Sequence, residues 1–291
     1  MTSVEADKVT PLSGFLRIWP AKQRRITTLN GRMPAFGVTS VGQDSRCKGN
    51  RRMIPLLADA IEAHGGLRQW KAHKHLSATI RCGGDLWALK EIEQDQTPRT
   101  MRIELHREWA SIAPFGKAGQ RTDFTPGRIA ILAEDERVVA ERNSPRASFA
   151  RHDMRTHWDP LHRAYFNGYA LWTCLTTPFL LAMDGFQLRE IEPWREGAEI
   201  WRGLRATFPA TIASHSTEQD FYFGPDMLIR RHDYSVEIAG NFSAAQYISD
   251  LVSIDGIKIP TRRRVYLRDE NLMPMLDTLM VSIDLSGFRF A

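Results

Sequence analysis

The sequence has 291 residues, of which 43% are hydrophobic, so it can form one large globular domain or two small ones. No apolar run reaches the roughly 18 residues that span a bilayer, so no integral membrane segment is predicted. Three cysteines, Cys47, Cys82 and Cys174, are too few and too scattered for a disulfide framework or a zinc site, and we expect free thiols.

The first 52 residues carry the positive charge of the chain. They contain ten Lys or Arg against three Asp or Glu, a net charge of +7, whereas the remaining residues carry 29 basic and 31 acidic side chains, a net charge of −2. A slightly acidic domain has no overall attraction to phosphate. The net positive charge of the whole chain therefore does not predict a nucleic-acid partner.

Residues 1–52 also lack a sustained apolar period, and such a segment buries too little apolar surface to offset the entropy of ordering it. We expect a basic, disordered leader followed by a single domain over residues 53–291. A start codon assigned too far upstream, a genuine disordered tail and an Arg-rich transit peptide remain alternatives for the leader. The start lacks a basic region followed by a continuous apolar one, so the sequence predicts a cytoplasmic protein.

The domain begins with a helical pattern from Pro55, which ends at Gly65 and Gly66. A short helical turn over residues 67–70 follows. Alternating apolar residues then predict a series of strands connected by short turns, which is typical of an antiparallel meander. These strands cover residues 76–82, 86–92, 100–108, 109–114, 121–125, 128–133 and 137–142.

Residues 157–183 interrupt the meander with a helical pattern that breaks at Pro178. Strands resume after it, with a hairpin turn over residues 223–227 and another at Asp255 and Gly256. About fourteen strands cannot lie flat, so the sheet is predicted to curl and the helices to cover its concave face. The later strands cover residues 187–193, 199–208, 217–223, 227–237, 245–254, 258–267 and 279–288.

Three motifs resemble bacterial proteins with the lipoprotein-carrier half-barrel fold. The first is a helix closed by Ala-His-Gly-Gly at residues 63–66, with Trp70 soon after it and Leu-Ser-Ala opening a strand at residue 76. The others are the hairpin segments FYFGPDMLIRRHDY (221–234) and SDLVSIDGIKIPTRRRVY (249–266).

This resemblance to the outer-membrane lipoprotein-sorting superfamily covers about residues 54–290. It implies an α+β fold with a curled antiparallel sheet, an N-terminal helix, an internal helical insert and a groove that holds an apolar molecule. The motifs are structural, so they specify the fold better than the function. The long insert departs from the minimal half-barrel and no export signal is visible, so we do not expect a role in lipoprotein sorting.

A His-rich stretch over residues 152–162 is the first candidate for chemistry. His157 and His162 are five residues apart and would not share a helix face, and the chain has neither HExxH nor CxxC. Glycine-rich nucleotide loops are also absent. The sequence therefore predicts no metal site and no cofactor.

The helix that follows carries a stripe of ring side chains. The residues at i, i+3, i+7 and i+10 or i+11 are His162, Tyr165, Tyr169 and Trp172 or Thr173. Facing the concave sheet, this stripe would supply polar groups to an apolar pocket, as in many small-molecule sites. In the alternative, the helix is simply amphipathic and its tyrosines pack with their hydroxyl groups at the rim.

The strand over residues 227–237 places His232 and Tyr234 on one face, near the carboxylates of the preceding strand. A histidine and a carboxylate on neighbouring strands can act as general acid and base, although satisfied structural hydrogen bonds are the alternative. Tyr222 is a further ligand-binding candidate. One arginine of residues 262–264, for which we take Arg264, is expected to point inward and hold a carboxylate or phosphate.

His215 lies between two serines, yet no GxSxG turn accompanies it, so a serine hydrolase is not indicated. The leading hypothesis is binding of a hydrophobic or amphipathic small molecule or lipid in the half-barrel groove, with Tyr169, Trp172, Tyr222 and Arg264 as ligand contacts. The alternative is an enzyme that acts on such a molecule by acid–base catalysis through His162, Tyr165, His232 and Tyr234. A third hypothesis is a sheet scaffold that pairs with another protein, and the oligomeric state is not indicated.

Overall fold

The computed structural model describes residues 53–93 and 96–291, and a single antiparallel sheet dominates this part of the chain. The sheet has 13 strands in the order β6-β5-β4-β3-β2-β1-β13-β12-β11-β10-β9-β8-β7, and it is not closed. The prediction of a curled antiparallel half-barrel is confirmed. The basic leader predicted over residues 1–52 lies outside the described residues, and the domain start at residue 53 stays a prediction.

The strands of the first arm and of the sheet centre are β1 (His75–Gly83), β2 (Arg99–Glu104), β3 (Ala110–Ala113), β4 (Arg121–Thr125), β5 (Arg128–Leu132) and β6 (Val138–Asn143). The strands of the second arm are β7 (Gln187–Glu196), β8 (Glu199–Thr207), β9 (Glu218–Phe223), β10 (Ile229–Val236), β11 (Phe242–Ile254), β12 (Ile257–Arg268) and β13 (Pro274–Phe290). Pairing of β1 with β13 joins the two arms, so the ends of the described sequence meet at the middle of the sheet.

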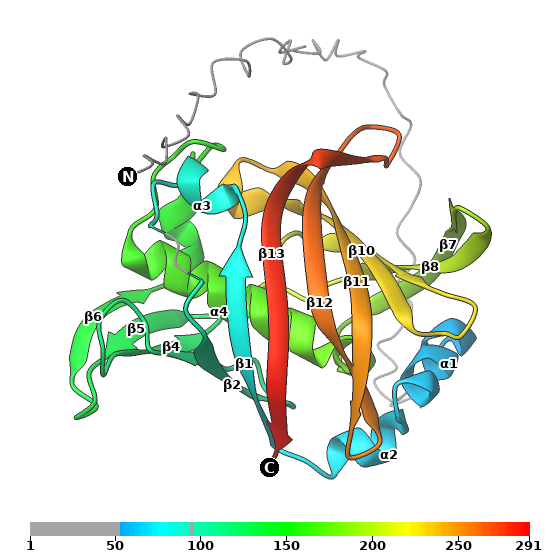
Figure 1. Ribbon diagram of the computed structural model, residues 1–291, viewed down its shortest axis with the longest axis horizontal. Coiled ribbons are helices and arrows are strands. Elements are labelled where there is room, and N and C mark those ends of the chain that lie inside the picture. The colour runs from blue at the N-terminus through cyan, green and yellow to red at the C-terminus, as the bar shows by residue number, and fades with distance from the viewer. Residues whose placement is uncertain (1–52, 94–95) are drawn as a thin grey trace, which may run out of the picture. The chain divides into compact units, whose positions relative to one another are not determined.

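The helices are α1 (Pro55–Ala63), α2 (Gly66–Lys71), α3 (Leu86–Leu89) and α4 (Pro160–Thr176), with short 3-10 helices η1 (Pro145–Phe149), η2 (Phe179–Ala182) and η3 (Glu237–Ala239). In Figure 1 the sheet curls around α4, which lies behind β1, β13 and β12 in this view. We call the face toward α4 concave and the other face convex. Among the described residues, no helix is long and apolar enough to cross a membrane.

Helix α1 ends where the sequence predicts, because Gly65 takes a left-handed φ of 115°. A Cβ at this position would lie 2.4 Å from the carbonyl oxygen of Gly256 in the β11–β12 turn, so glycine also permits a close approach of two backbones. Trp70 of α2 then stacks on Phe179, with ring centroids 4.2 Å apart. The N-terminal helices are thereby fixed against η2 and the β11–β12 turn.

The sequence prediction is wrong at residues 86–92, where the structure has the short helix α3 and no strand. Leu86 and Trp87 are buried there, and the Trp87 indole donates to the carbonyl oxygen of Gly83, 3.1 Å away. Periodicity does not distinguish a helix from a strand in so short an apolar run. The turns at residues 223–227 and at Asp255 and Gly256 do connect strands, as predicted.

Candidate functional site

Helix α4 fills the concave face. Pro160 stands at its first position, and the Asp159 side chain accepts a hydrogen bond from the backbone N–H of His162. Nearly every α4 residue after the first turn is buried, as expected of a helix enclosed on all sides. At Gly168 the helix approaches β4 so closely that a Cβ would lie 2.3 Å from the Phe124 ring. The groove predicted from the sequence is therefore occupied by the helical insert along most of its length.

The predicted stripe and the predicted strand pair meet inside the half-barrel, and His215 connects them. The Tyr169 hydroxyl lies 3.2 Å from Nδ1 of His215, whose ring stacks on Tyr234 with centroids 4.1 Å apart. Tyr234 in turn contacts His232, at 4.6 Å between centroids. A continuous series of ring contacts thus runs from α4 to β10.

At the β10 end of this series, polar side chains form hydrogen bonds with the buried groups. The Nε2 atom of His232 lies 2.7 Å from Oε1 of Gln219. Arg263 is the inward-pointing arginine, and it donates both to Gln246 and to the carbonyl oxygen of Cys174 on α4. Arg264 lies on the other face, where it pairs with Asp284 at 2.8 Å. The inner groups hold α4 to the sheet.

Burial keeps the inner histidines neutral. It lowers the pKa of His215 to about 3, with the charge of Arg146 acting in the same direction. Burial also lowers the pKa of His232 well below its usual value and raises that of Tyr234. All three side chains are at most 4% exposed.

The other predicted site residues lie apart from one another. His162 caps the start of α4, where burial lowers its pKa, and the Trp172 indole donates to the carbonyl oxygen of Glu104. Tyr222 lies on the convex face beside the Arg231 guanidinium, at 5.7 Å. Tyr234 lines a polar cavity, and Tyr165 lines another cavity, between α4 and the β8–β9 segment.

That cavity has a volume of about 380 Å³ and lies where the two arms of the sheet approach each other across α4. We call it the mouth cavity. Pro126 of the β4–β5 turn and Tyr165 form one side. The β8–β9 segment forms the other, with Phe208, Pro209 and Ile212. Its walls combine apolar side chains with polar ones in about equal measure.

Arg146 supplies the cation of the mouth cavity. It donates to the carbonyl oxygen of Ser214 at 2.8 Å and pairs with Glu237, which is 43% exposed. Nearby, Glu108 is buried and accepts a 2.8 Å bond from the Ala213 backbone, while its Oε1 atom has no partner among the described residues. Burial raises the pKa of Glu108 well above its usual value, which favours the neutral form of this carboxyl. The cavity therefore holds the Arg146 guanidinium, paired with Glu237, beside apolar side chains.

Sequence reasoning missed Arg146 and Glu108. Arg146 follows a predicted strand in a polar stretch, and its partners Ser214 and Glu237 are 68 and 91 residues away along the chain. Glu108 stands at the end of a predicted strand. No local pattern could identify either residue, because tertiary contacts alone bring them to the cavity.

No family model matches the chain, and no curated protein matches it. Several solved structures are similar. A LolA superfamily protein from Nitrosomonas europaea has 10% identity, with a TM-score of 0.45 over 81% of this chain and 92% of that one. A DUF1329 family protein from Desulfovibrio piger has 14% identity, with a TM-score of 0.44 over 81% and 91%. A putative outer-membrane lipoprotein-sorting protein domain from Vibrio parahaemolyticus has 11% identity, with a TM-score of 0.45 over 79% and 91%.

The first and third of these belong, by their descriptions, to the superfamily expected from the sequence. At these TM-scores the likeness carries no argument about a ligand or an activity. The prediction of a cytoplasmic location is wrong, because one of these neighbours is described as a putative outer-membrane lipoprotein-sorting protein domain. That prediction depended on the start of the sequence, which lies outside the described residues.

Proposed function

We propose that this protein binds an amphipathic small molecule with an anionic head group, in the mouth cavity of the half-barrel. The observation that carries the proposal is the Arg146 guanidinium beside the apolar wall of Phe208, Pro209 and Ile212. Ligand sites combine such apolar walls with a few polar groups that fix orientation. A guanidinium is well matched to a carboxylate or phosphate head group.

The partners of Arg146 support this function. Glu237 is partly exposed and can turn toward solvent when a ligand anion takes its place. The bond to the Ser214 carbonyl oxygen uses a different nitrogen, Nη1, and so can hold the guanidinium in position during that exchange. Tyr165, with its hydroxyl group close to Arg146, adds a second polar group to the same wall.

The volume sets the size of the ligand. About 380 Å³ accommodates a single medium-length acyl chain, and α4 occupies the space that a larger lipid would need. Acid–base catalysis has weaker support, because the buried histidines are neutral and have no access to the cavity. We therefore favour binding over catalysis.

The test is calorimetric titration of the protein with decanoate and with decanol, which share an alkyl chain and differ in the carboxylate. We expect decanoate to bind about tenfold or more tightly than decanol, since a charge-assisted hydrogen bond is lost with the head group. Arg146→Gln should remove that difference. Ala210→Trp, which places a bulky side chain at the cavity, should weaken both ligands.

Arg137→Gln is the matched control, because Arg137 is an exposed arginine in the β5–β6 turn whose only ion-pair partner among residues 53–93 and 96–291 is Asp135. It should bind decanoate like the unmodified protein. Equal affinity for decanoate and decanol, or an Arg146→Gln variant that still discriminates between them, would refute the proposal. Failure of both molecules to bind would refute it as well.

A further inference from the structure

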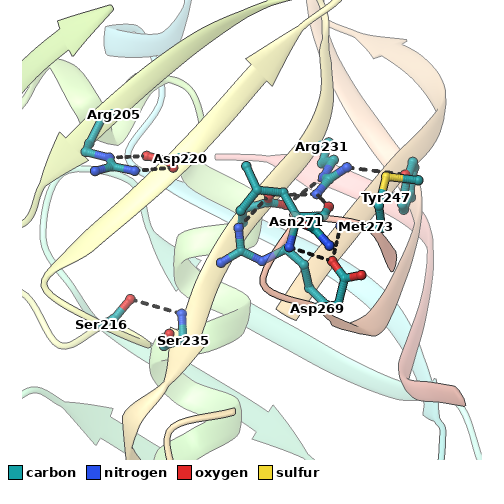
Figure 2. A network of polar contacts seen from close by, with 12 residues as sticks. Arg205, Ser216, Asp220, Arg231, Ser235, Tyr247, Asp269, Asn271 and Met273 are labelled. Atoms are coloured by element: carbon teal, nitrogen blue, oxygen red, sulfur yellow. Dashed lines mark hydrogen bonds and ion pairs between the residues drawn. The ribbon is translucent and has the colours of Figure 1, made fainter. Parts of the chain in front are cut away.

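A second cavity lies on the convex face, over strands β8, β9 and β10, and it differs from the mouth cavity in its chemistry. Its volume is about 310 Å³, and its lining consists almost wholly of polar side chains. Small residues, among them Ser216, Thr217 and Ser235, leave the space open. Arg205 and Arg268 both line it. Figure 2 shows Arg205 with Asp220 on one side of this network and Arg231 with Tyr247 on the other.

Two aspartates stand directly opposite each other in this region. Asp220 of β9 and Asp233 of β10 are partners in the strand register. Like charges in such a pair are about 5 Å apart at their Cβ atoms and repel each other. Arg205 binds Asp220 in a bidentate pair, at 2.6 and 2.7 Å. Arg231 binds Asp233 in the same way, at 2.7 and 2.8 Å.

Each arginine leaves its aspartate with unused acceptor capacity, because a carboxylate offers about four lone-pair sites. Arg231 is fully buried beneath Trp194, with the guanidinium 4.2 Å from the indole centroid, so it serves as a fixed countercharge. Burial is the first reason why the pKa of Asp233 is raised, and the charge of Asp220 acts in the same direction. A ligand cation beside both carboxylates would relieve that repulsion.

Arg268 supplies the opposite charge. Its Nη1 atom lies 3.1 Å from Oδ2 of Asp233, which Arg231 already neutralises. Its Nε atom is buried and has no hydrogen-bond partner among the described residues. A buried donor without a partner loses free energy, and a ligand carboxylate would restore the bond. The cavity thus places the Arg268 guanidinium, whose Nε donor has no partner among the described residues, next to a pair of carboxylates.

The charges around the cavity cancel. Four acidic side chains line it, Glu218, Asp220, Asp233 and Glu237, against the two arginines, and two further arginines outside it pair with Asp233 and Glu237. A neutral cavity with separated charges does not favour a simple anion or a simple cation. It fits a molecule that carries both charges within a few ångströms.

We propose that the convex cavity binds a free α-amino acid, with its ammonium group beside Asp220 and Asp233 and its carboxylate at Arg268. The two cavities adjoin, since Thr217 and Glu237 line both, but Arg268, Asp220 and Asp233 line the convex cavity and not the mouth cavity.

The experiment titrates the full chain with each of the common L-amino acids at millimolar concentrations, by calorimetry. For the tightest binder, the corresponding amine without the carboxylate and the N-acetyl derivative without the ammonium group are then compared. Each analogue should lose about tenfold or more in affinity, since each lacks one charge-assisted contact. This comparison needs no variant and so does not depend on the stability of one.

Arg268→Gln and Asp220→Asn should each weaken binding of the amino acid by a similar factor. Arg262→Gln is the control, because this arginine lies on the same strand as Arg268 but pairs with Asp250 outside the cavity. The proposal fails if no amino acid binds, if either analogue binds as well as the parent, or if Arg268→Gln binds normally. Inorganic phosphate that binds in place of the amino acid would also overturn it.

Discussion

The two faces of strand β10 bury different kinds of polar group. His232 and Tyr234 point to the concave face, where they are neutral and bind neutral partners. Arg231 and Asp233 point to the convex face, where they are buried as a charged pair. Alternation along β10 therefore separates neutral side chains on one face from an ion pair on the other.

The difference follows from what covers each face. Helix α4 covers the concave face with aromatic rings, which carry no charge. Protonating a histidine there costs more free energy than leaving it neutral. The convex face is covered by Trp194 and the loop before β13, whose Leu272 carbonyl oxygen accepts from Arg231 at 2.6 Å. Bidentate pairing with Asp233 allows the charge of Arg231 to remain buried on this face.

The largest expected effect tests the ionic face. Arg231→Ala leaves Asp233 buried with only Arg268 as partner, and the free energy of unfolding should fall by about 3–5 kcal/mol. Urea denaturation measures this change. The double variant Arg231→Ala with Asp233→Ala should be less destabilised than the sum of the single variants. A loss below about 1 kcal/mol would mean that the pair is not held as described.

The next largest effect is the pH dependence of stability that the neutral histidine His215 on the concave face should produce. His215 has a pKa of about 3 in the folded protein against 6.5 as its ordinary value, so only the unfolded chain gains this proton between those limits. The stability contributed by neutral His215 is complete above pH 6.5 and is lost as the pH falls. At pH 5 the loss is about 2 kcal/mol.

The contribution of Glu108 to stability changes with pH in the opposite direction. Its raised pKa favours the folded state as the pH falls. The measurement must therefore compare the protein with the His215→Gln variant, in which the glutamate contribution is unchanged. The variant should lose less stability between pH 7 and pH 5 in urea denaturation. Parallel pH profiles would show that His215 takes up a proton in the folded state.

A smaller effect tests how closely α4 fills the concave face. Gly168→Ala gains helix propensity but drives a methyl group into Phe124, and the two contributions leave a net loss of about 1 kcal/mol. Thermal denaturation measures it. Gly127→Ala is the control, since a Cβ there has no neighbour within 4 Å. Stabilisation of the Gly168 variant would mean that α4 can move away from β4.

The smallest effect concerns an ion pair that is exposed on both sides. Arg262 and Asp250 are each about half exposed, at 53% and 50%. Arg262→Gln should change the free energy of unfolding by less than about 1 kcal/mol in urea denaturation, because solvent screens such pairs. A loss as large as that of Arg231→Ala would remove the distinction between buried and exposed pairs on this sheet.

Sequence patterns predicted the sheet, the helical insert and its break at Pro178, because each depends on local periodicity or on proline and glycine chemistry. The alternation that separates His232 from Asp233 was also visible. The role of His215 was not, since its partner Tyr169 is 46 residues away and the flanking serines suggested a different chemistry. Contacts across the sheet decide such roles.

The seam between the two arms has a mechanical consequence. No strand ladder connects β6 with β7, and the described contacts there include the Glu108 bond to Ala213 and the Arg146 bonds to Ser214 and Glu237. A sheet closed strand to strand opens only by breaking a row of backbone hydrogen bonds. At this seam a few side-chain contacts join the two arms instead, so we expect the half-barrel to widen at its mouth before any of its thirteen strands separates.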